Sequence, residues 1–436
     1  MTFSINRHGL TWFINTQTQP TTKHESNSTT YWNCHIKNIL CVFLYFTAAL
    51  IVVLSLVSPL WAAQKKTFTI TDFEGRQVEI PIQINRVVTI SDGLIEGVMT
   101  CLGQAEKIVG IGSACLPKVW AYDIPSSTGA PHEYRDGMNP VFFLNPFLAD
   151  LPLVSQSGSG INFEAIAKLT PDLIIVRTGS CSLSASKDIL AKNIRLLASL
   201  GAPLVVLHGP NTFDRPDIAS LNREIELLGA VFQKQERAKE MADFLLATVN
   251  DIKARTADIP PENQKRVLML GLSPTARENG GAGHVKGEKT IQTYLLNEFA
   301  HARNAFSGTG AWNILNAEQL IALDPDLIVL VTAWGYHPPE ELYEAPYYKN
   351  LCHMRAVESK AVTALPWTPC NCEKRLEYPI DVMVMARAAY PQRFADIDLC
   401  DWLHQFYMAV YGVNRNTAAQ LVSCQWMAWA CKGDHK

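Results

Sequence analysis

The stretch LPWTPCNCEKRLEYPID, residues 365–381, gathers several side chains that could bind a ligand. Cys370 and Cys372 could ligate a soft metal or form a disulfide, and Arg375 could bind an anion. The C-x-C spacing differs from the C-x2-C spacing of zinc sites, and no second paired-cysteine motif accompanies it. We therefore interpret the stretch first as a loop in the wall of a ligand cleft, followed by a helix that begins near Glu373. Metal ligation by the two cysteines is kept as a second interpretation.

Further cations and aromatic side chains follow the apolar runs of the chain. In doubly wound sheets, ligands bind outside the carboxyl ends of the strands, where such side chains would gather. The candidate ligand contacts at these places are Arg177, Arg277, Trp334, Tyr336, Trp367 and Arg375. Aromatic walls with a few cations suit a bulky chelate or macrocycle that bears carboxylates, or else an oxyanion. A bare hard cation would need more carboxylates or histidines than these segments supply.

The elements that must position these residues are indicated by an internal repeat. The segments FEAIAKLTPDLIIV (163–176) and AEQLIALDPDLIVL (317–330) each predict a short amphipathic helix, a Pro-Asp turn and an apolar run. In this alignment Glu164 corresponds to Glu318. Short apolar runs between helices are typical of buried parallel strands. The repeat therefore predicts an α/β fold of two similar Rossmann-like lobes.

A long charged segment between the two repeats predicts a single linker helix. Apolar residues recur at i, i+3, i+4 and i+7 from Ala238 to Ile252, and Pro260 with Pro261 then ends the pattern. The expected division is an N-terminal lobe over residues 64–232, a linker helix over 233–261, and a C-terminal lobe with a helical extension over 262–436.

The N-terminus combines a polar extension, residues 1–38, with an uncharged apolar segment, residues 39–63. The apolar segment is long enough to span a bilayer as a helix. Its end, with Pro59 and the Ala62-Ala63 pair, resembles a signal-peptidase site. We expect the extension to be disordered and the apolar segment to be a cleaved signal peptide or a retained membrane anchor. Either outcome predicts a periplasmic or otherwise extracytoplasmic protein.

The composition excludes some classes of function. The chain of 436 residues has a net charge of −3 and no long basic block, so nucleic acid is not an expected partner. Nine of its 11 cysteines follow Ala63, and an odd number leaves at least one of them without an intramolecular partner. No Ser-His-Asp or paired-carboxylate set is apparent, so we expect no enzyme. The alternative is a metal-dependent enzyme that uses Cys370 and Cys372.

Several blocks in series resemble the substrate-binding proteins of ABC importers for ferric siderophores, haem and cobalamin. The resemblance covers about residues 67–395, through ITDFEGRQVEIPIQINRVVTISDGLIEGVMTCLGQAEKIVGIG, FEAIAKLTPDLIIV, GEKTIQTYLLNEFAHARNAF and WNILNAEQLIALDPDLIVL. It implies two lobes joined by one long helix, with the ligand in the cleft between them. It also implies a monomer without a covalent cofactor, which captures a ferric siderophore, haem or a corrinoid and delivers it to an ABC permease dimer.

In such proteins one surface glutamate on each lobe contacts the permease, and the resemblance places Glu96 and Glu318 at these positions. The alternative within the same class is a receptor for a small oxyanion such as molybdate or tungstate. That receptor would hold its ligand with Arg177, Arg277 and Arg375.

Overall fold

A computed structural model describes most of the chain from Lys66 onward. The described ranges are 66–156, 160–179, 183, 186–271, 277–278, 282–311, 313–331, 335–369 and 375–432. All of them belong to one compact unit, Lys65–Lys436. The apolar segment 39–63 and the extension before it lie outside the described residues. Within these ranges, no helix has both the length and the apolar character that a membrane crossing requires.

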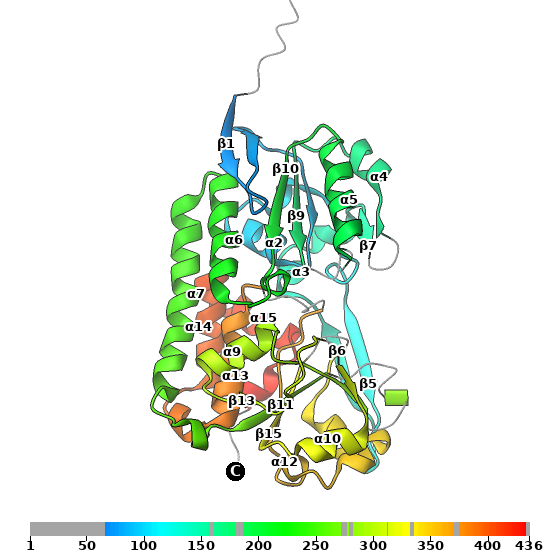
Figure 1. The fold of residues 1–436 in the computed structure, drawn as a ribbon, viewed down its shortest axis with the longest axis vertical. Helices are drawn as coiled ribbons and strands as arrows, with labels where there is room; N and C mark the ends of the chain where they lie inside the picture. The colour runs from blue at the N-terminus through cyan, green and yellow to red at the C-terminus, as the bar shows by residue number, and fades with distance from the viewer. Residues whose placement is uncertain are drawn as a thin grey trace, which may run out of the picture. The chain divides into compact units, whose positions relative to one another are not determined.

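The first half of this unit contains a parallel sheet of four strands in the order β10-β9-β3-β4. The strands are β3 (Val87–Ile90), β4 (Ile108–Ile111), β9 (Leu173–Thr178) and β10 (Leu204–His208). β3 and β9 are buried along their whole length because helices cover both faces of the sheet. One face packs on α2 (Leu94–Cys101) and α6 (Ile218–Val231), and the other on α4 (Phe163–Lys168) and α5 (Lys187–Ala198) (Figure 1).

The second half contains a mixed sheet in the order β14-β12-β11-β15-β16, with β13 beside β11. The strands are β11 (Arg266–Gly271), β12 (Gly283–Val285), β13 (Arg303–Asn304), β14 (Asn313–Leu315), β15 (Leu327–Leu330) and β16 (Val362–Ala364). β11 pairs in parallel with β13 and β15, whereas β12 is antiparallel to both of its neighbours. The repeated segments form equivalent pairs, α4 with β9 and α10 (Ala317–Leu323) with β15. The expectation of two α/β lobes is thus confirmed.

A single long helix, α7 (Gln235–Thr256), separates the two sheets in the sequence. Its buried residues from Ala238 to Ile252 follow the apolar pattern that the sequence predicts, and they pack on α6, α9 (Ile291–Phe299) and α13 (Tyr378–Ala389). Burial of such side chains stabilises the packing by about 1.5–3 kcal/mol each. The helix ends before Pro260, as the proline pair predicts.

Hairpins add short sheets to the two lobes. The N-terminal hairpin, β1 (Thr67–Thr71) with β2 (Gln77–Pro81), turns at Gly75, whose φ of 74° suits glycine. A second hairpin, β5 (Trp120–Ile124) with β6 (His132–Gly137), runs beside the elements of the second half, down to the region of α10 and α12 (Figure 1). The sequence pattern did not predict this hairpin. A two-residue pair, β7 (Ser155–Gln156) with β8 (Gly160–Ile161), completes the set.

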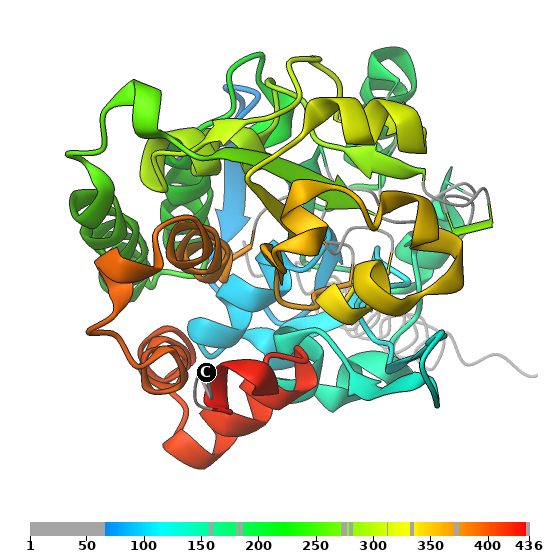
Figure 2. The ribbon, with the colours of Figure 1, turned by 90° about the horizontal axis from the view of Figure 1, so that it is seen from below.

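The C-terminal extension consists of α14 (Leu399–Tyr411) and α15 (Arg415–Cys424), and a disulfide joins Cys400 to Cys431. These helices contact α2, α3 (Pro140–Leu144) and β6 of the first half, so they do not only cover the second lobe (Figure 2). The remaining helices are α11 (Pro339–Glu344) and α12 (Arg355–Glu358). Short 3-10 helices are η1 (Ala105–Lys107), η2 (Pro146–Asp150), η3 (Pro210–Thr212), η4 (Pro261–Asn263), η5 (Pro346–Leu351), η6 (Pro391–Phe394) and η7 (Ala428–Cys431).

Candidate functional site

Arg375 lies where the loop after β16 meets the loop after β3. Its side chain is buried, with 3% of the residue exposed, and its Nη2 donates to the carbonyl oxygen of Pro369. Nε and Nη1 have no hydrogen-bond partner. A Cβ at Gly93, the residue before α2, would stand 3.1 Å from Nε, so the guanidinium of one half reaches the backbone of the other. Glycine is required there because φ is 115° and because a side chain would displace the arginine.

Two further buried polar groups lie against the same loop. Asn139 accepts a hydrogen bond from the backbone N–H of Val141 at 2.8 Å, whereas its Nδ2 has no partner. That Nδ2 would be 3.3 Å from a Cβ at Gly93. The neighbouring Asp92 uses Oδ1 for an ion pair and leaves Oδ2 without a partner. A buried polar atom without a partner costs about 1–3 kcal/mol, so a cluster of them indicates a place for a ligand.

Aromatic rings from several segments pack together next to this region. The cluster joins the buried Tyr336, Trp367 and Trp426 with Trp120, Tyr122 and Tyr134 of the second hairpin. Trp367 and Trp426 are stacked with centroids 5.6 Å apart, and Trp120 meets Trp367 edge-on at 5.6 Å. The indole N–H groups of Trp120 and Trp367 are buried and have no acceptor. They add two neutral donors to this part of the protein.

The sequence predicted only part of this aromatic cluster. Tyr336 and Trp367, two of the candidate ligand contacts, belong to it, whereas Trp334 lies outside the described residues. The hairpin residues and Trp426 were missed. The alternation of aromatic and polar residues from Trp120 to Ile124 is the signal that could have revealed a half-buried strand there.

Arg177 does not act as a free cation toward a cleft. It is fully buried, its Nε and Nη2 donate to the two carboxylate oxygens of Glu224 at 2.8 Å, and its Nη1 donates to Asp92 at 3.0 Å. Burial raises the pKa of Glu224 to about 7, although the arginine acts in the opposite direction. Neighbouring carboxylates therefore already occupy the Arg177 guanidinium, which argues against the prediction that Arg177 contacts the ligand.

Arg277 is likewise held by a carboxylate. Its Nε donates to Glu341 at 2.6 Å, and its Nη2 lies 3.0 Å from the Tyr336 carbonyl oxygen and from Nδ1 of His337. Burial alone would raise the pKa of Glu341, but the hydrogen bonds and charges of His337 and Arg277 lower it to about 2. Of the three predicted arginines, Arg375 is the one that has fully buried donors without a partner.

The predicted docking glutamates differ in their surroundings. Glu96 is fully buried in α2 and accepts a hydrogen bond from the hydroxyl of Ser91 at 2.5 Å. Burial raises its pKa. The expectation of a surface carboxylate is wrong for Glu96, because its helix face lies against the core. Glu318 is exposed on α10, and its repeat counterpart Glu164 is exposed on α4.

The proposed metal ligands Cys370 and Cys372 lie outside the described residues. Within the described ranges, one group of three potential ligands comes together, namely Cys400, His404 and Cys431. The disulfide between the two cysteines leaves neither sulfur as a thiolate. Cys115 is also disulfide-bonded. Disulfides agree with an oxidising compartment.

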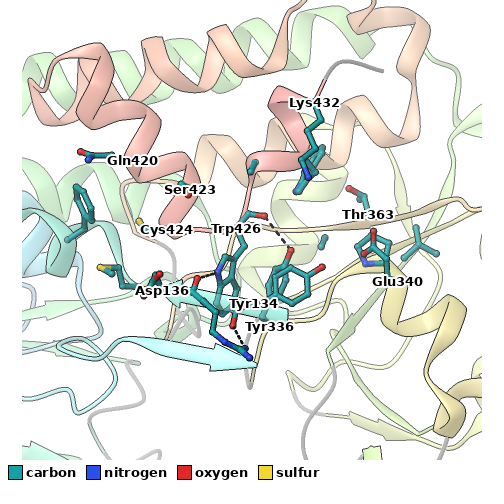
Figure 3. Close-up of a pocket in the computed structure, with 18 residues that line it drawn as sticks. Tyr134, Asp136, Tyr336, Glu340, Thr363, Gln420, Ser423, Cys424, Trp426 and Lys432 are labelled. Carbon is teal, nitrogen blue, oxygen red and sulfur yellow. Dashed lines mark hydrogen bonds between the residues drawn. The ribbon is translucent and has the colours of Figure 1, made fainter. Parts of the chain in front are cut away.

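A cavity of about 640 Å³ lies on the other side of the aromatic cluster, between β6, β16 and the C-terminal segment (Figure 3). Tyr336 and Trp426 form part of its wall. Trp367, Arg375 and Asn139 do not line it. The cavity and the Arg375 region therefore have different lining residues.

The family model for periplasmic binding proteins matches residues 91–367. The chain belongs to this family. It is accordingly the extracytoplasmic substrate-binding component of an ABC transporter, in a family of binding proteins rather than enzymes. The two-lobed fold is that of the class that includes siderophore, haem and cobalamin receptors.

The proteins to which this chain is similar are named for different ligands. The molybdate-binding protein MolA of Haemophilus influenzae is 25% identical over 355 residues, which are 78% of this chain and 90% of MolA. The Fe(3+)-citrate-binding protein YfmC of Bacillus subtilis is 25% identical over 190 residues, 44% of this chain and 53% of YfmC. The crystal structure of a periplasmic solute-binding protein from Veillonella parvula covers 84% of this chain and 99% of its own, at 20% identity and a TM-score of 0.62.

Proposed function

We propose that this binding protein captures a small oxyanion of the molybdate class at Arg375 and delivers it to an ABC permease. The observation that carries the proposal is the buried Arg375 guanidinium, whose Nε and Nη1 have no partner beside the N-terminal loop of α2. Oxyanions accept several hydrogen bonds at once, and donors to an anion in a partly dry site contribute about 1.5–3 kcal/mol each.

Neutral donors support this interpretation. The Nδ2 of Asn139 faces the same loop as Arg375, and the indole N–H groups of Trp120 and Trp367 also lack acceptors. One cation and several neutral N–H donors favour a compact anion here, whereas the Asp92 carboxylate at the same loop, already paired with Arg177, opposes it. The similarity to MolA favours the same ligand class.

A ferric chelate is the second candidate ligand, and the cluster of six aromatic residues favours it. Aromatic walls bind bulky organic ligands, and Arg375 would then hold a carboxylate of the chelator. The similarity to YfmC points in this direction, although it covers a smaller part of the chain. Soft-metal ligation by Cys370 and Cys372 stays a prediction.

Calorimetric titration of the purified protein with molybdate tests the proposal. Arg375→Ala should raise the Kd about 10- to 150-fold, because each tenfold change corresponds to about 1.4 kcal/mol. Arg375→Lys should restore only part of the affinity, since the planar fork of donors is lost. The matched control is Arg393→Ala, which removes an exposed arginine paired with Asp258.

The outcomes separate the two ligands. Molybdate binding that depends on Arg375 but not on Arg393 supports the oxyanion receptor. Binding of ferric citrate with the same dependence, and no binding of molybdate, supports the chelate receptor. If both ligands bind the Arg375→Ala variant as they bind the wild type, Arg375 is not a ligand contact.

We further propose that the protein contacts its permease through Glu318 and Glu164 rather than through Glu318 and Glu96. Both glutamates are exposed, and they occupy equivalent positions of the internal repeat, in the helices that precede β15 and β9. One carboxylate on each lobe could therefore contact the two halves of a permease dimer.

A further inference from the structure

The cavity of about 640 Å³ is built by three parts of the chain that are distant in sequence. Tyr134 and Asp136 come from β6, Glu340 and Thr363 from α11 and β16 of the second half, and Trp426, Trp429 and Lys432 from the C-terminal segment (Figure 3). Its volume lies within the range of about 300–1,000 Å³ that is usual for small-molecule sites. It is thus large enough for an organic ligand.

Aromatic rings provide most of the apolar wall of this cavity. Tyr134, Tyr336 and Trp426 contact one another, with centroids 4.6–5.5 Å apart, and they form one side. Trp429, with 38% of its surface exposed, stands nearer to solvent. The faces of such rings carry negative potential and attract cations that have lost part of their water.

The charges of the cavity favour the same kind of ligand. Glu340 lines the cavity together with Tyr134 and Tyr336. Its charge raises the pKa of both tyrosines, after the larger effect of burial. Asp136 and Glu340 make no ion pair with any described residue, so two carboxylates are available.

The cations of the cavity only partly oppose this preference. Arg135 is already paired with Asp123 at 2.6 Å and with Glu133 at 3.3 Å. Lys432 therefore stands alone against two carboxylates among the described lining residues.

We propose that this cavity is a second ligand site, separate from the Arg375 site, and that it binds an organic cation with a substituted ammonium group. The ammonium group lies against the rings of Tyr134 and Trp429 and close to the carboxylate of Glu340. The apolar body of the ligand covers the remaining aromatic wall. Arg375 does not line this cavity.

The test measures by calorimetry the binding of choline and of 3,3-dimethyl-1-butanol to the full chain with its disulfides intact. The alcohol is the uncharged analogue of choline, in which carbon replaces nitrogen. Choline should bind about tenfold more tightly than the alcohol if cation–π contacts and carboxylates select the charge. Glu340→Gln and Trp429→Leu should each raise the Kd of choline about 3- to 10-fold. Lys432→Gln should lower the Kd of choline, because it removes a positive charge from the cavity. A misfolded variant would bind choline more weakly, so misfolding cannot explain this result.

The matched control is Glu318→Gln, which removes an exposed carboxylate on α10 that does not line the cavity. It should leave choline binding unchanged, and Glu340→Gln should leave molybdate binding unchanged. The proposal is overturned if choline and the alcohol bind equally, or if neither binds at millimolar concentration. Equal effects of Glu340→Gln and Glu318→Gln would also overturn it, because the charge effect would then not belong to the cavity.

Discussion

Glu341 is the buried carboxylate whose charge the surrounding residues stabilise most clearly. Tyr347 and Arg277 donate to its Oε1 at 2.7 and 2.6 Å, and Nδ1 of His337 lies 3.0 Å from Oε2. The pKa of Glu341 falls from 4.5 to about 2 against the opposing effect of burial. Because the pKa is lower in the folded state, the group stabilises the fold above the unfolded-state pKa and loses this contribution as the pH falls.

We therefore predict a pH-dependent loss of stability for Glu341→Gln. Near pH 7 the variant should unfold more easily by on the order of 3 kcal/mol, from a shift of about 2.5 pKa units. The difference from the wild type should shrink progressively between about pH 5 and pH 2. Urea unfolding at several pH values measures this difference, and Glu358→Gln, which changes an exposed carboxylate of α12, is the control. A difference that stays constant over this range would contradict the pKa shift.

At the residue scale, the sequence predicted which side chains lie near the strand ends but not which of them are already paired. Arg177 meets Glu224, which is 47 positions away, and Arg277 meets Glu341, which is 64 positions away. Such partners follow from the tertiary fold and leave no local pattern. Arg375 follows an apolar run, which is a local signal, and the structure shows it to be buried. Its contact with a ligand stays a prediction.

The β5–β6 hairpin is the element that ties the first half most directly to the second. At its tip, Ser126 and His132 lie 2.6 and 2.8 Å from Oε2 of Glu344, at the end of α11. The backbone N–H of Ser127 donates to the carbonyl oxygen of the same glutamate at 2.9 Å. The hairpin therefore brings its aromatic residues to the cluster while one carboxylate holds its tip.

We predict that Glu344→Ala loosens this hairpin without unfolding the protein. The glutamate side chain is partly exposed, so the loss in global stability should stay below about 1 kcal/mol. Amide hydrogen exchange should accelerate in β5 and β6 and stay unchanged in β9, which lies in the core. Glu133→Gln, an exposed carboxylate on the hairpin itself, is the control. Unchanged exchange in the hairpin of the Glu344→Ala variant would show that the tip contacts do not hold it.

Elements with a clear hydrophobic pattern were predicted from the sequence, whereas the half-exposed strands of the second hairpin were missed. The buried strands β3, β9, β11 and β15 appear as apolar runs, and α7 appears as a long helical period. In β5 the alternation from Trp120 to Ile124 is visible but extends over only five residues, and in β6 the charged residues hide it. Their burial comes from contact with the other half of the chain, which no local window contains.

At the scale of the whole molecule, the C-terminal helices connect the two halves of the chain. α14 and α15 follow the second sheet but pack on α2 and α3 of the first half. The backbone N–H of Met138 donates to the Cys424 carbonyl oxygen at 3.0 Å, and Trp426 donates through Nε1 to the Arg135 carbonyl oxygen at 2.7 Å. α7, the second hairpin and this extension therefore give three connections between the halves, so binding should involve only a small change in their arrangement.

The permease contact that we propose involves two glutamates on opposite halves of the molecule. Glu164 and Glu318 are exposed on the equivalent helices α4 and α10. The double variant Glu164→Ala/Glu318→Ala should keep the molybdate affinity of the wild type within about twofold and lower transport by about an order of magnitude, since interface charges assist association and register. The measurement is uptake of labelled molybdate in cells that carry the protein and its permease, with Glu106→Ala/Glu262→Ala as a control that removes two other surface carboxylates. Transport equal to that of the control would contradict docking through this pair, whereas loss of ligand affinity would assign the residues to the binding site instead.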